Sequence, residues 1–157
     1  MGGSDSTLTI GDVIGLERSV NIFAGLTRDI NAVSDRLDSA SDNTTVLAPL
    51  DSAITKLSTK PWEDASDYSA LGESAYEGKS GEDRAQRNLR RFVEAHIVHE
   101  SPWTEKHKIQ TLGGNTIWWE RKEGKTYIYP GAIEVTSQSK KAGNGEIWVV
   151  DGVVNAA

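Results

Sequence analysis

Residues 45–54 constrain the fold more than any other part of this chain. The apolar residues 46–48 predict a short buried strand, and Pro49 ends it because proline has no N–H group to donate to a neighbouring strand. Asp51 or Ser52 then has the side chain needed to cap a new helix. This stretch therefore predicts a strand, a sharp corner and a helix start in direct succession.

Two later stretches complete the pattern. Asn144 and Gly145 form a turn pair that precedes the strongly β-prone residues 147–150. Between this stretch and the first lie residues 93–99, in which His96 precedes two aliphatic residues. Each stretch alone is a weak signal, but their order and spacing together are specific.

In this order and spacing, the three stretches resemble the fasciclin-type adhesion domain family. The chain departs from the family pattern at three positions. The family usually has Thr where this chain has Leu50 and Tyr where it has Ala95, and it often has His or another polar residue where this chain has Trp148. The residues that match the family boxes are Thr45, Val46, Ala48, Pro49, Asp51, His96, Asn144, Gly145, Ile147 and Asp151. The resemblance implies an α+β fold, a β-wedge of about seven strands with an N-terminal helical layer.

The length suits one domain. We expect residues 1–6 to be a disordered leader and residues 7–157 to be a single fasciclin-like domain excised from a longer protein. Residues 57–81 are polar, with aromatic residues at no clear period, and they predict an insertion loop that is long for a connection in a compact domain. This loop is either pinned by its aromatic residues or available to bind a partner.

Apolar periodicity predicts three N-terminal helices and one central helix. The first three cover residues 9–17, 20–30 with Ser19 as cap, and 33–37, and the central helix begins with a capping box at residues 80–83. The central helix should carry its apolar stripe to the core and lead into a strand at residues 97–98.

A hairpin is predicted from residues 116–122 and 125–129, in a register that places Trp118 opposite Tyr129. An exposed Trp–Tyr pair would suit a protein interface, because aromatic residues are enriched there. The alternative, which we favour, is that helices of the same domain cover the pair. Residues 137–145 are expected to form a polar turn before the closing strand.

Arg84, Arg87 and Arg91 fall on one outer face of the central helix. They would suit sulfated glycans or anionic lipid headgroups. Alternatively they pair with acids such as Asp83 and Glu94, which we favour because charged outer faces are usual on helices.

The formal net charge of −6 argues against a nucleic-acid partner, since binding phosphates requires a basic surface. The chain has no cysteine, which excludes disulfides and thiol chemistry. No apolar run is long enough to span a bilayer, so we expect membrane contact only through segments outside this sequence.

No catalytic pattern stands out. His96 and His99, three residues apart on an expected strand, would point to opposite faces and could not chelate one metal ion. His96 more simply makes a buried hydrogen bond. Carboxylates are dispersed, and no serine lies in a nucleophile-elbow context. We therefore expect no enzymatic activity, no metal and no cofactor.

The resemblance implies a non-enzymatic adhesion or protein-interaction module of a secreted or membrane-anchored protein, located extracellularly or at the cell surface. Its partners would be other proteins or matrix components. Asn43 begins an N-glycosylation sequon, and the lack of an integrin motif suggests a fungal relative. The alternatives are a luminal domain of a vacuolar or endomembrane protein that tethers membranes, and a glycan- or lipid-binding module.

Overall fold

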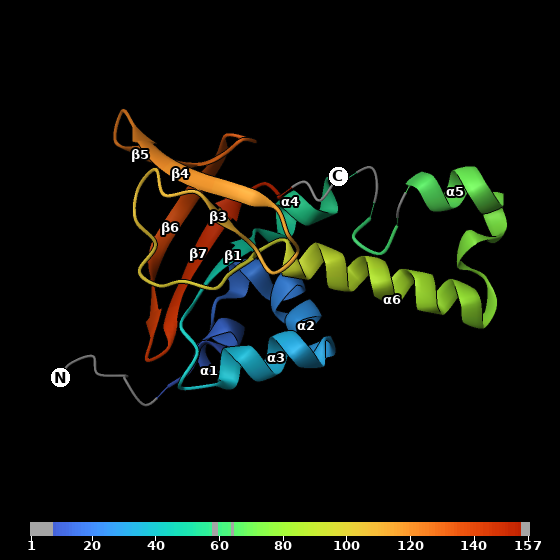
Figure 1. Cartoon of the computed structure of the whole chain (residues 1–157), viewed down its shortest axis with the longest axis horizontal. Coiled ribbons are helices and arrows are strands. Elements are labelled where there is room, and N and C mark those ends of the chain that lie inside the picture. The colour runs from blue at the N-terminus through green and yellow to red at the C-terminus, as the bar shows by residue number, and fades with distance from the viewer. Residues whose placement is uncertain (1–7, 58–59, 64, 155–157) are drawn as a thin grey trace.

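A single sheet of seven strands organises the molecule, with the strand order β2-β1-β7-β6-β5-β4-β3. The computed structural model describes residues 8–57, 60–63 and 65–154, so the expected leader at residues 1–6 lies outside the described part. An isolated bridge between Val98 and Thr111 joins the two ends of the sheet, which thereby curls into a nearly closed barrel (Figure 1). The expected α+β wedge is confirmed.

The described helices all precede residue 95, and the described strands all follow it except β1, which lies between α3 and α4. The strands are β1 (Thr44–Pro49), β2 (Ile97–Val98), β3 (Ile109–Gln110), β4 (Thr116–Lys122), β5 (Lys125–Tyr129), β6 (Ile133–Ala142) and β7 (Gly145–Asp151). The helices are α1 (Ile10–Val13), α2 (Asn21–Asp29), α3 (Asn31–Asp38), α4 (Asp51–Thr55), α5 (Ala65–Leu71) and α6 (Gly78–Glu94), with 3-10 turns η2 (Ile14–Leu16), η3 (Arg18–Val20) and η4 (Gly72–Tyr76).

The first and last family boxes lie side by side. Strands β1 and β7 pair in parallel, with Val46 opposite Ile147 and Ala48 opposite Val149. These four side chains belong to one core cluster, which α1–α3 and the end of α6 cover from one side of the sheet. A second core fills the interior of the barrel around three tryptophans, Trp103, Trp119 and Trp148. The proline-ended strand and the late aliphatic strand therefore pack as the sequence predicted.

The turn before β7 is fixed by one buried amide. Asn144 Oδ1 accepts a hydrogen bond of 2.8 Å from the backbone N–H of Ile10, and Asn144 Nδ2 donates to the carbonyl oxygens of Leu37 (2.8 Å) and Ser39 (2.9 Å). At Gly145, φ is +150°, and a Cβ atom there would overlap the Thr44 carbonyl oxygen. The Asn-Gly pair is thus required by the contact between the helical layer and the sheet.

One local expectation was wrong in the strand-rich half. The polar turn expected at residues 137–145 is mostly strand, because β6 continues to Ala142 and pairs with β7. Irregularities between Val135 and Ser137 and between Ser137 and Lys140 interrupt the regular pairing. This strand carries polar residues because one of its faces is open to solvent, so its composition resembles that of a loop.

Three expected helix caps were also wrong. Ser19 lies within η3 and its hydroxyl donates to Glu17, while α2 begins at Asn21. Asp51 belongs to the first turn of α4, and its carboxylate accepts the backbone N–H of Ile22 at the start of α2 (2.8 Å). The central helix begins at Gly78, ahead of the expected box at residues 80–83.

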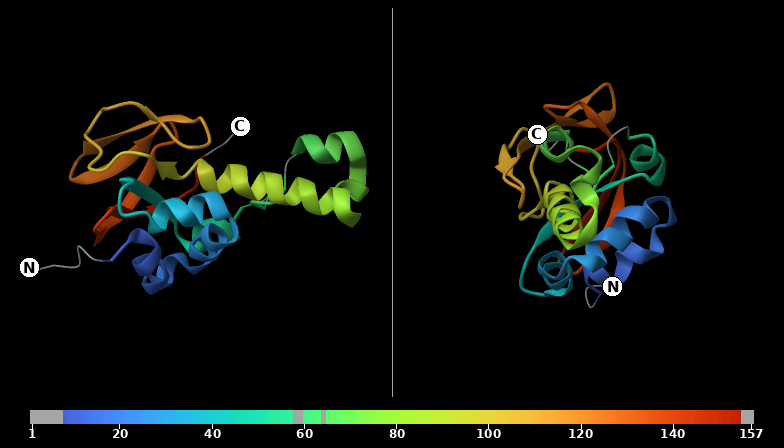
Figure 2. Two further views of the ribbon diagram at one scale, coloured as in Figure 1. Left: turned by 60° about the horizontal axis from the view of Figure 1, so that its bottom comes forward. Right: turned by 90° about the vertical axis from the view of Figure 1, so that its right-hand side faces the viewer.

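The expected insertion loop at residues 57–81 is largely helical, which corrects the prediction. It contains α5 and η4, which fold back along the first half of α6 and form a helical arm with it (Figure 2). The arm extends away from the barrel, as Figure 1 and the left view of Figure 2 show. The close approach of η4 to α6 requires glycine at position 81, since a Cβ atom there would overlap the backbone of Tyr76. The aromatic residues of this segment show no single period because they are divided among several short elements of the arm.

Candidate functional site

The outer face of the β4–β5 hairpin carries a stacked aromatic pair. The predicted register is confirmed, with Trp118 opposite Tyr129 and Trp119 opposite Ile128. The rings of Trp118 and Tyr129 lie 5.9 Å apart between centroids with an angle of 20° between their planes. Trp119 points the other way, into the barrel, where it meets Trp148 edge to face. Alternation along β4 therefore separates one tryptophan for the core from one for the surface.

A lysine lies over each ring of the pair. Lys108 Nζ is 5.0 Å from the centroid of Trp118, and Lys122 Nζ is 5.0 Å from the centroid of Tyr129. The pKa of Lys122 is raised, first by its hydrogen bond with the Tyr129 side chain. We call Lys108, Trp118, Tyr129 and Lys122 the lysine–aromatic column. Among the described ion pairs, none involves either of these lysines, although the charge of Glu120 also contributes to the raised pKa of Lys122.

The expectation that helices cover the aromatic pair was wrong. Both rings are half-buried, but the groups over them are lysines, and the hairpin lies on the side of the barrel away from α1–α3 (Figure 1). Glu120 borders the pair and accepts the indole N–H of Trp118 at 2.9 Å. The N-terminal helices and the end of α6 pack against another part of the sheet, around β1 and β7. They therefore leave this hairpin uncovered.

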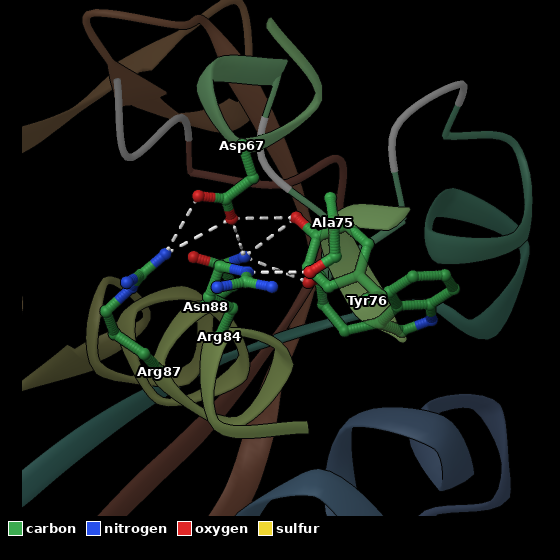
Figure 3. A network of polar contacts seen from close by, with 7 residues as sticks. Asp67, Ala75, Tyr76, Arg84, Arg87 and Asn88 are labelled. Atoms are coloured by element: carbon green, nitrogen blue, oxygen red, sulfur yellow. Dashed lines mark hydrogen bonds and ion pairs between the residues drawn. The ribbon is translucent and has the colours of Figure 1, made fainter. Parts of the chain in front are cut away.

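Polar side chains hold the helical arm together (Figure 3). The Asp67 carboxylate accepts hydrogen bonds from Tyr76 Oη (2.9 Å), Asn88 Nδ2 (3.0 Å) and Arg87 Nη2 (3.1 Å). The Asn88 amide lowers the pKa of Asp67 most, and Tyr76 and Arg87 add to the effect against an opposing contribution from burial. Asn88 Nδ2 also donates to the Trp62 carbonyl oxygen at 3.0 Å. This network, the arm latch, joins α5 and η4 to α6.

Two of the three arginines on the predicted basic face bond to groups of the helical arm. Arg84 Nε donates to the Ala75 carbonyl oxygen, and Arg87 forms an ion pair of 3.1 Å with Asp67. Arg91 is exposed further along α6. Arg87 thus pairs with an acid, as the favoured alternative expected, but the acid is Asp67 of α5 and not Asp83 or Glu94. Arg84 and Arg87 are therefore bound to groups of the arm.

His96 lies in a turn between α6 and β2 rather than on the strand itself, and it is fully buried. Its Nδ1 is 2.8 Å from the Phe92 carbonyl oxygen, and its Nε2 accepts the backbone N–H of Val154 at 2.8 Å. Burial lowers the pKa of His96 to about 4, so the ring is neutral near pH 7. The predicted buried hydrogen bond is confirmed, and His99 is exposed.

Within the described residues, no three His, Asp or Glu side chains are grouped in a way that could hold a metal ion. The same part of the chain has no helix with the length and apolar content that a bilayer span requires. Asn43 is exposed just before β1, and its carbonyl oxygen accepts a hydrogen bond from Arg36 Nη2 at 2.9 Å.

Comparison with known proteins decides the family. The family model for the Fasciclin domain matches residues 18–156, which is most of the chain. The chain belongs to the fasciclin domain family. Fasciclin domains are generally non-enzymatic adhesion or protein-interaction modules.

Relatives of this fasciclin domain occur in several fungi, in agreement with the suggested fungal kinship. A FAS1 domain-containing protein of Neurospora crassa is 54% identical over 156 residues, covering 99% of this chain and 68% of that protein. Similar proteins of Emericella nidulans (48% identity, 98% of this chain, 65% of the relative) and Schizosaccharomyces pombe (30% identity, 88% and 72%) also match. The chain thus spans about two thirds of the length of these relatives.

A solved structure supports the fold. The FAS1 domain pair from the insect cell adhesion molecule fasciclin I matches 94% of this chain and 51% of that chain, with a TM-score of 0.64 and 15% identity. At this identity the similarity shows that the two share the fasciclin fold.

Sequence reasoning named Trp118 and Tyr129 but missed the other parts of the site. Lys108 lies outside the hairpin, and Lys122 is four residues from Trp118, so no short motif joins the lysines to the rings. The pairing register could have placed Lys122 on the same strand face as Trp118. Asp67 and Asn88 of the arm latch are 21 residues apart and carried no signal at all.

Proposed function

We propose that this fasciclin domain is a protein-interaction module that supports adhesion as part of a secreted or membrane-anchored protein. The lysine–aromatic column is the observation that carries this proposal. It combines half-exposed Trp118 and Tyr129 with two ammonium groups that have no acidic partner among the described ion pairs. Tryptophan and tyrosine are enriched among the few residues that contribute most of the binding energy of protein interfaces.

The arrangement of the column favours a protein partner with acidic side chains. The lysine stems already lie over the aromatic rings, so less side-chain freedom is lost when a carboxylate binds to their ammonium groups. Negative charges are interspersed on the same hairpin face, where Glu120 contacts Trp118 and Glu134 of the neighbouring strand lies 3.9 Å from Lys125. Such mixed charge, with a net charge of −6, suits a complementary protein surface better than a polyanion.

An adhesion assay with the full-length protein tests this function. Cells that display the full-length protein are allowed to attach to cells that do not, and attachment is compared with that of the double variant Trp118→Ala, Lys122→Glu. We expect attachment to fall about tenfold or more, since losing a hot-spot residue costs about 2 kcal/mol or more. Unchanged attachment would reject the column as the contact surface.

The matched control is the double variant Trp62→Ala, Lys79→Glu on the helical arm. Both residues are exposed, and the control makes the same changes in side-chain type and charge far from the hairpin. It should leave attachment unchanged. Equal losses in both variants would show a general effect on folding or charge instead of a local contact.

Secretion or membrane anchoring is a separate part of the proposal. The exposed position of Asn43 ahead of β1 supports it, because the transferase acts on accessible sequons in the secretory pathway. Mass spectrometry of Asn43 in the full-length protein, together with its localisation, tests this point. Cell-surface localisation would support the proposal, and retention in the vacuole would favour the luminal alternative.

A further inference from the structure

A pocket of about 550 Å³ opens at one end of the barrel, beside the column, with which it shares only Tyr129 among the described residues. It lies between the turn at residues 113–115 and the start of β4, the end of β5 and the loop at residues 130–131, and residues 153–154 after β7. Its size falls within the range of small-molecule sites, roughly 300–1,000 Å³. The mouths of β-barrels are common places for such sites.

The walls of the pocket are held in place by bonds to the rest of the domain. The backbone N–H of Gly113 donates to the Glu94 carbonyl oxygen (3.0 Å), and that of Gly114 donates to Thr111 (2.9 Å). On the other side, the Val154 N–H is bound by buried His96. These bonds fix the turn and the C-terminal segment independently of any ligand, so the pocket is preorganised and binding needs little ordering of the chain.

The chemistry of the lining is neutral and mixed. None of the residues that line the pocket carries a charge, and the lining combines Asn115, Thr116 and Tyr129 with aliphatic residues such as Ile133 and Val153. An ionic ligand would find no opposite charge in this lining. A wholly apolar ligand would displace the water that is hydrogen-bonded to the polar groups of the lining. It could not replace those hydrogen bonds, and leaving polar groups unbonded costs free energy.

From this lining we infer that the barrel-end pocket binds a neutral saccharide. A sugar ring presents C–H groups on its faces, which suit the aliphatic residues, and hydroxyl groups at its edge, which suit amide and hydroxyl side chains. The glycine-rich walls let a ring approach the backbone closely, as glycines do at ligand sites. This inference goes beyond the proposed adhesion function and does not depend on it.

Titration of the isotope-labelled protein followed by amide NMR tests the inference. The probes are the neutral disaccharides cellobiose, laminaribiose, mannobiose and chitobiose, with octanoate and a sulfated disaccharide as comparison ligands. At least one neutral disaccharide should cause saturable shifts in the amide signals of Gly113, Gly114 and Gly131, with a dissociation constant of about 1 mM or below.

The variant Gly131→Leu fills the pocket. A Cβ atom at Gly131 would lie 3.4 Å from Ile133, which is ordinary contact, so the backbone tolerates a side chain there. Saccharide binding should weaken at least tenfold. Gly25→Leu is the matched control, since it adds the same side chain on α2 where a Cβ atom meets nothing within 4 Å, and it should bind as the parent protein does.

Four outcomes would overturn the inference: no saturable shift with any neutral disaccharide up to about 50 mM, equal weakening in both variants, binding of octanoate alone, or binding of the sulfated disaccharide alone. The last would place ligand binding at the charged groups of Lys108 and Lys122. The variant Lys108→Glu changes the column at Trp118, which does not line the pocket, and it should retain saccharide binding. Failure of the adhesion proposal and failure of this one are therefore distinguishable.

Discussion

The backbone N–H of Val154 donates a hydrogen bond of 2.8 Å to Nε2 of His96, whose Nδ1 lies 2.8 Å from the carbonyl oxygen of Phe92. A backbone N–H only donates and a carbonyl only accepts, so the neutral ring with its proton on Nδ1 satisfies both. The rings of Phe23 and Phe92 pack against the imidazole, at 5.5 and 4.8 Å between centroids. One neutral side chain thus ties the end of α6 to the segment after β7.

Acid should weaken the fold through His96. Its pKa is about 4 in the folded protein because of burial, against about 6.5 in the unfolded chain, so the unfolded state binds more protons between these values. The free energy of unfolding should therefore be unaffected by His96 above about pH 6.5 and fall by about 3 kcal/mol as the pH drops to 4. Urea unfolding at a series of pH values measures this slope.

The variant His96→Gln removes the titrating group and places a neutral polar amide at the site. It should be less stable than the parent at pH 7 but show a flatter dependence between pH 6.5 and 4. His99→Gln, at an exposed position, should keep the parent slope. If His96→Gln retained the full slope, other groups would be responsible for the acid sensitivity.

Asn144 should be one of the most sensitive positions in the protein. Its side chain is 1% exposed and makes hydrogen bonds with Ile10, Leu37 and Ser39. Asn144→Ala should lower the free energy of unfolding by about 3 kcal/mol or more, because it leaves buried backbone groups unsatisfied. Thermal or urea unfolding, followed by circular dichroism, measures the loss.

The isosteric change Asn144→Asp separates hydrogen bonding from size. It keeps the acceptor for Ile10 but places a carboxylate against the carbonyl oxygens of Leu37 and Ser39, so it should be at least as damaging as Asn144→Ala near pH 7. Asn43→Ala at the exposed sequon is the control and should change stability by less than about 0.5 kcal/mol. Tolerance of Asn144→Asp would contradict the assigned amide orientation.

The sequence predicted those parts of the fold where local signals and packing agree. Residues 46–48 have an apolar pattern and a proline that ends the strand, and β1 places them against β7 as expected. The hairpin register followed from its two-residue turn, which fixes every pair from Lys122–Lys125 to Trp118–Tyr129. In such segments a single periodicity determines which side chains face the core.

Other parts could not be predicted because their contacts join distant residues. The helical arm depends on Asp67 and Asn88, whose bond becomes visible only once α5 folds back on α6. Likewise, Lys108 reaches Trp118 from the loop before β3, where its position is set by the path of the loop. Polar strands present a different difficulty, since β6 has the composition of a loop and is defined by its pairing with β7.

The helical arm should open independently of the barrel. Asn88 is 4% exposed, and its Nδ2 donates to Trp62, Asp67 and Tyr76. Asn88→Ala removes these bonds, so α5 and η4 should exchange their amide hydrogens at least tenfold faster, while β1 and β7 are unchanged. Hydrogen exchange followed by mass spectrometry measures both regions in one experiment.

Arg90→Ala is the control for the arm, since Arg90 forms a solvent-exposed ion pair with Glu94 on the same helix. Such a pair is worth about 0.5 kcal/mol, and its loss should not change exchange in α5. If Asn88→Ala accelerated exchange equally in the barrel strands, the arm would unfold only with the whole domain.

Trp148 should be required for the barrel core, although the family often has a polar residue there. It is 3% exposed, stacks on Trp103 at 5.4 Å between centroids and meets Trp119 edge to face. Trp148→Ala should lower the free energy of unfolding by about 3–5 kcal/mol, as for other buried aromatic truncations.

Trp148→Phe keeps a ring in the stack and should cost clearly less, whereas Trp62→Ala at a partly exposed position should cost about 1 kcal/mol. Equal losses for the alanine and phenylalanine variants in urea unfolding would show that Trp148 acts mainly through its N–H bond to Glu146 and not through its ring.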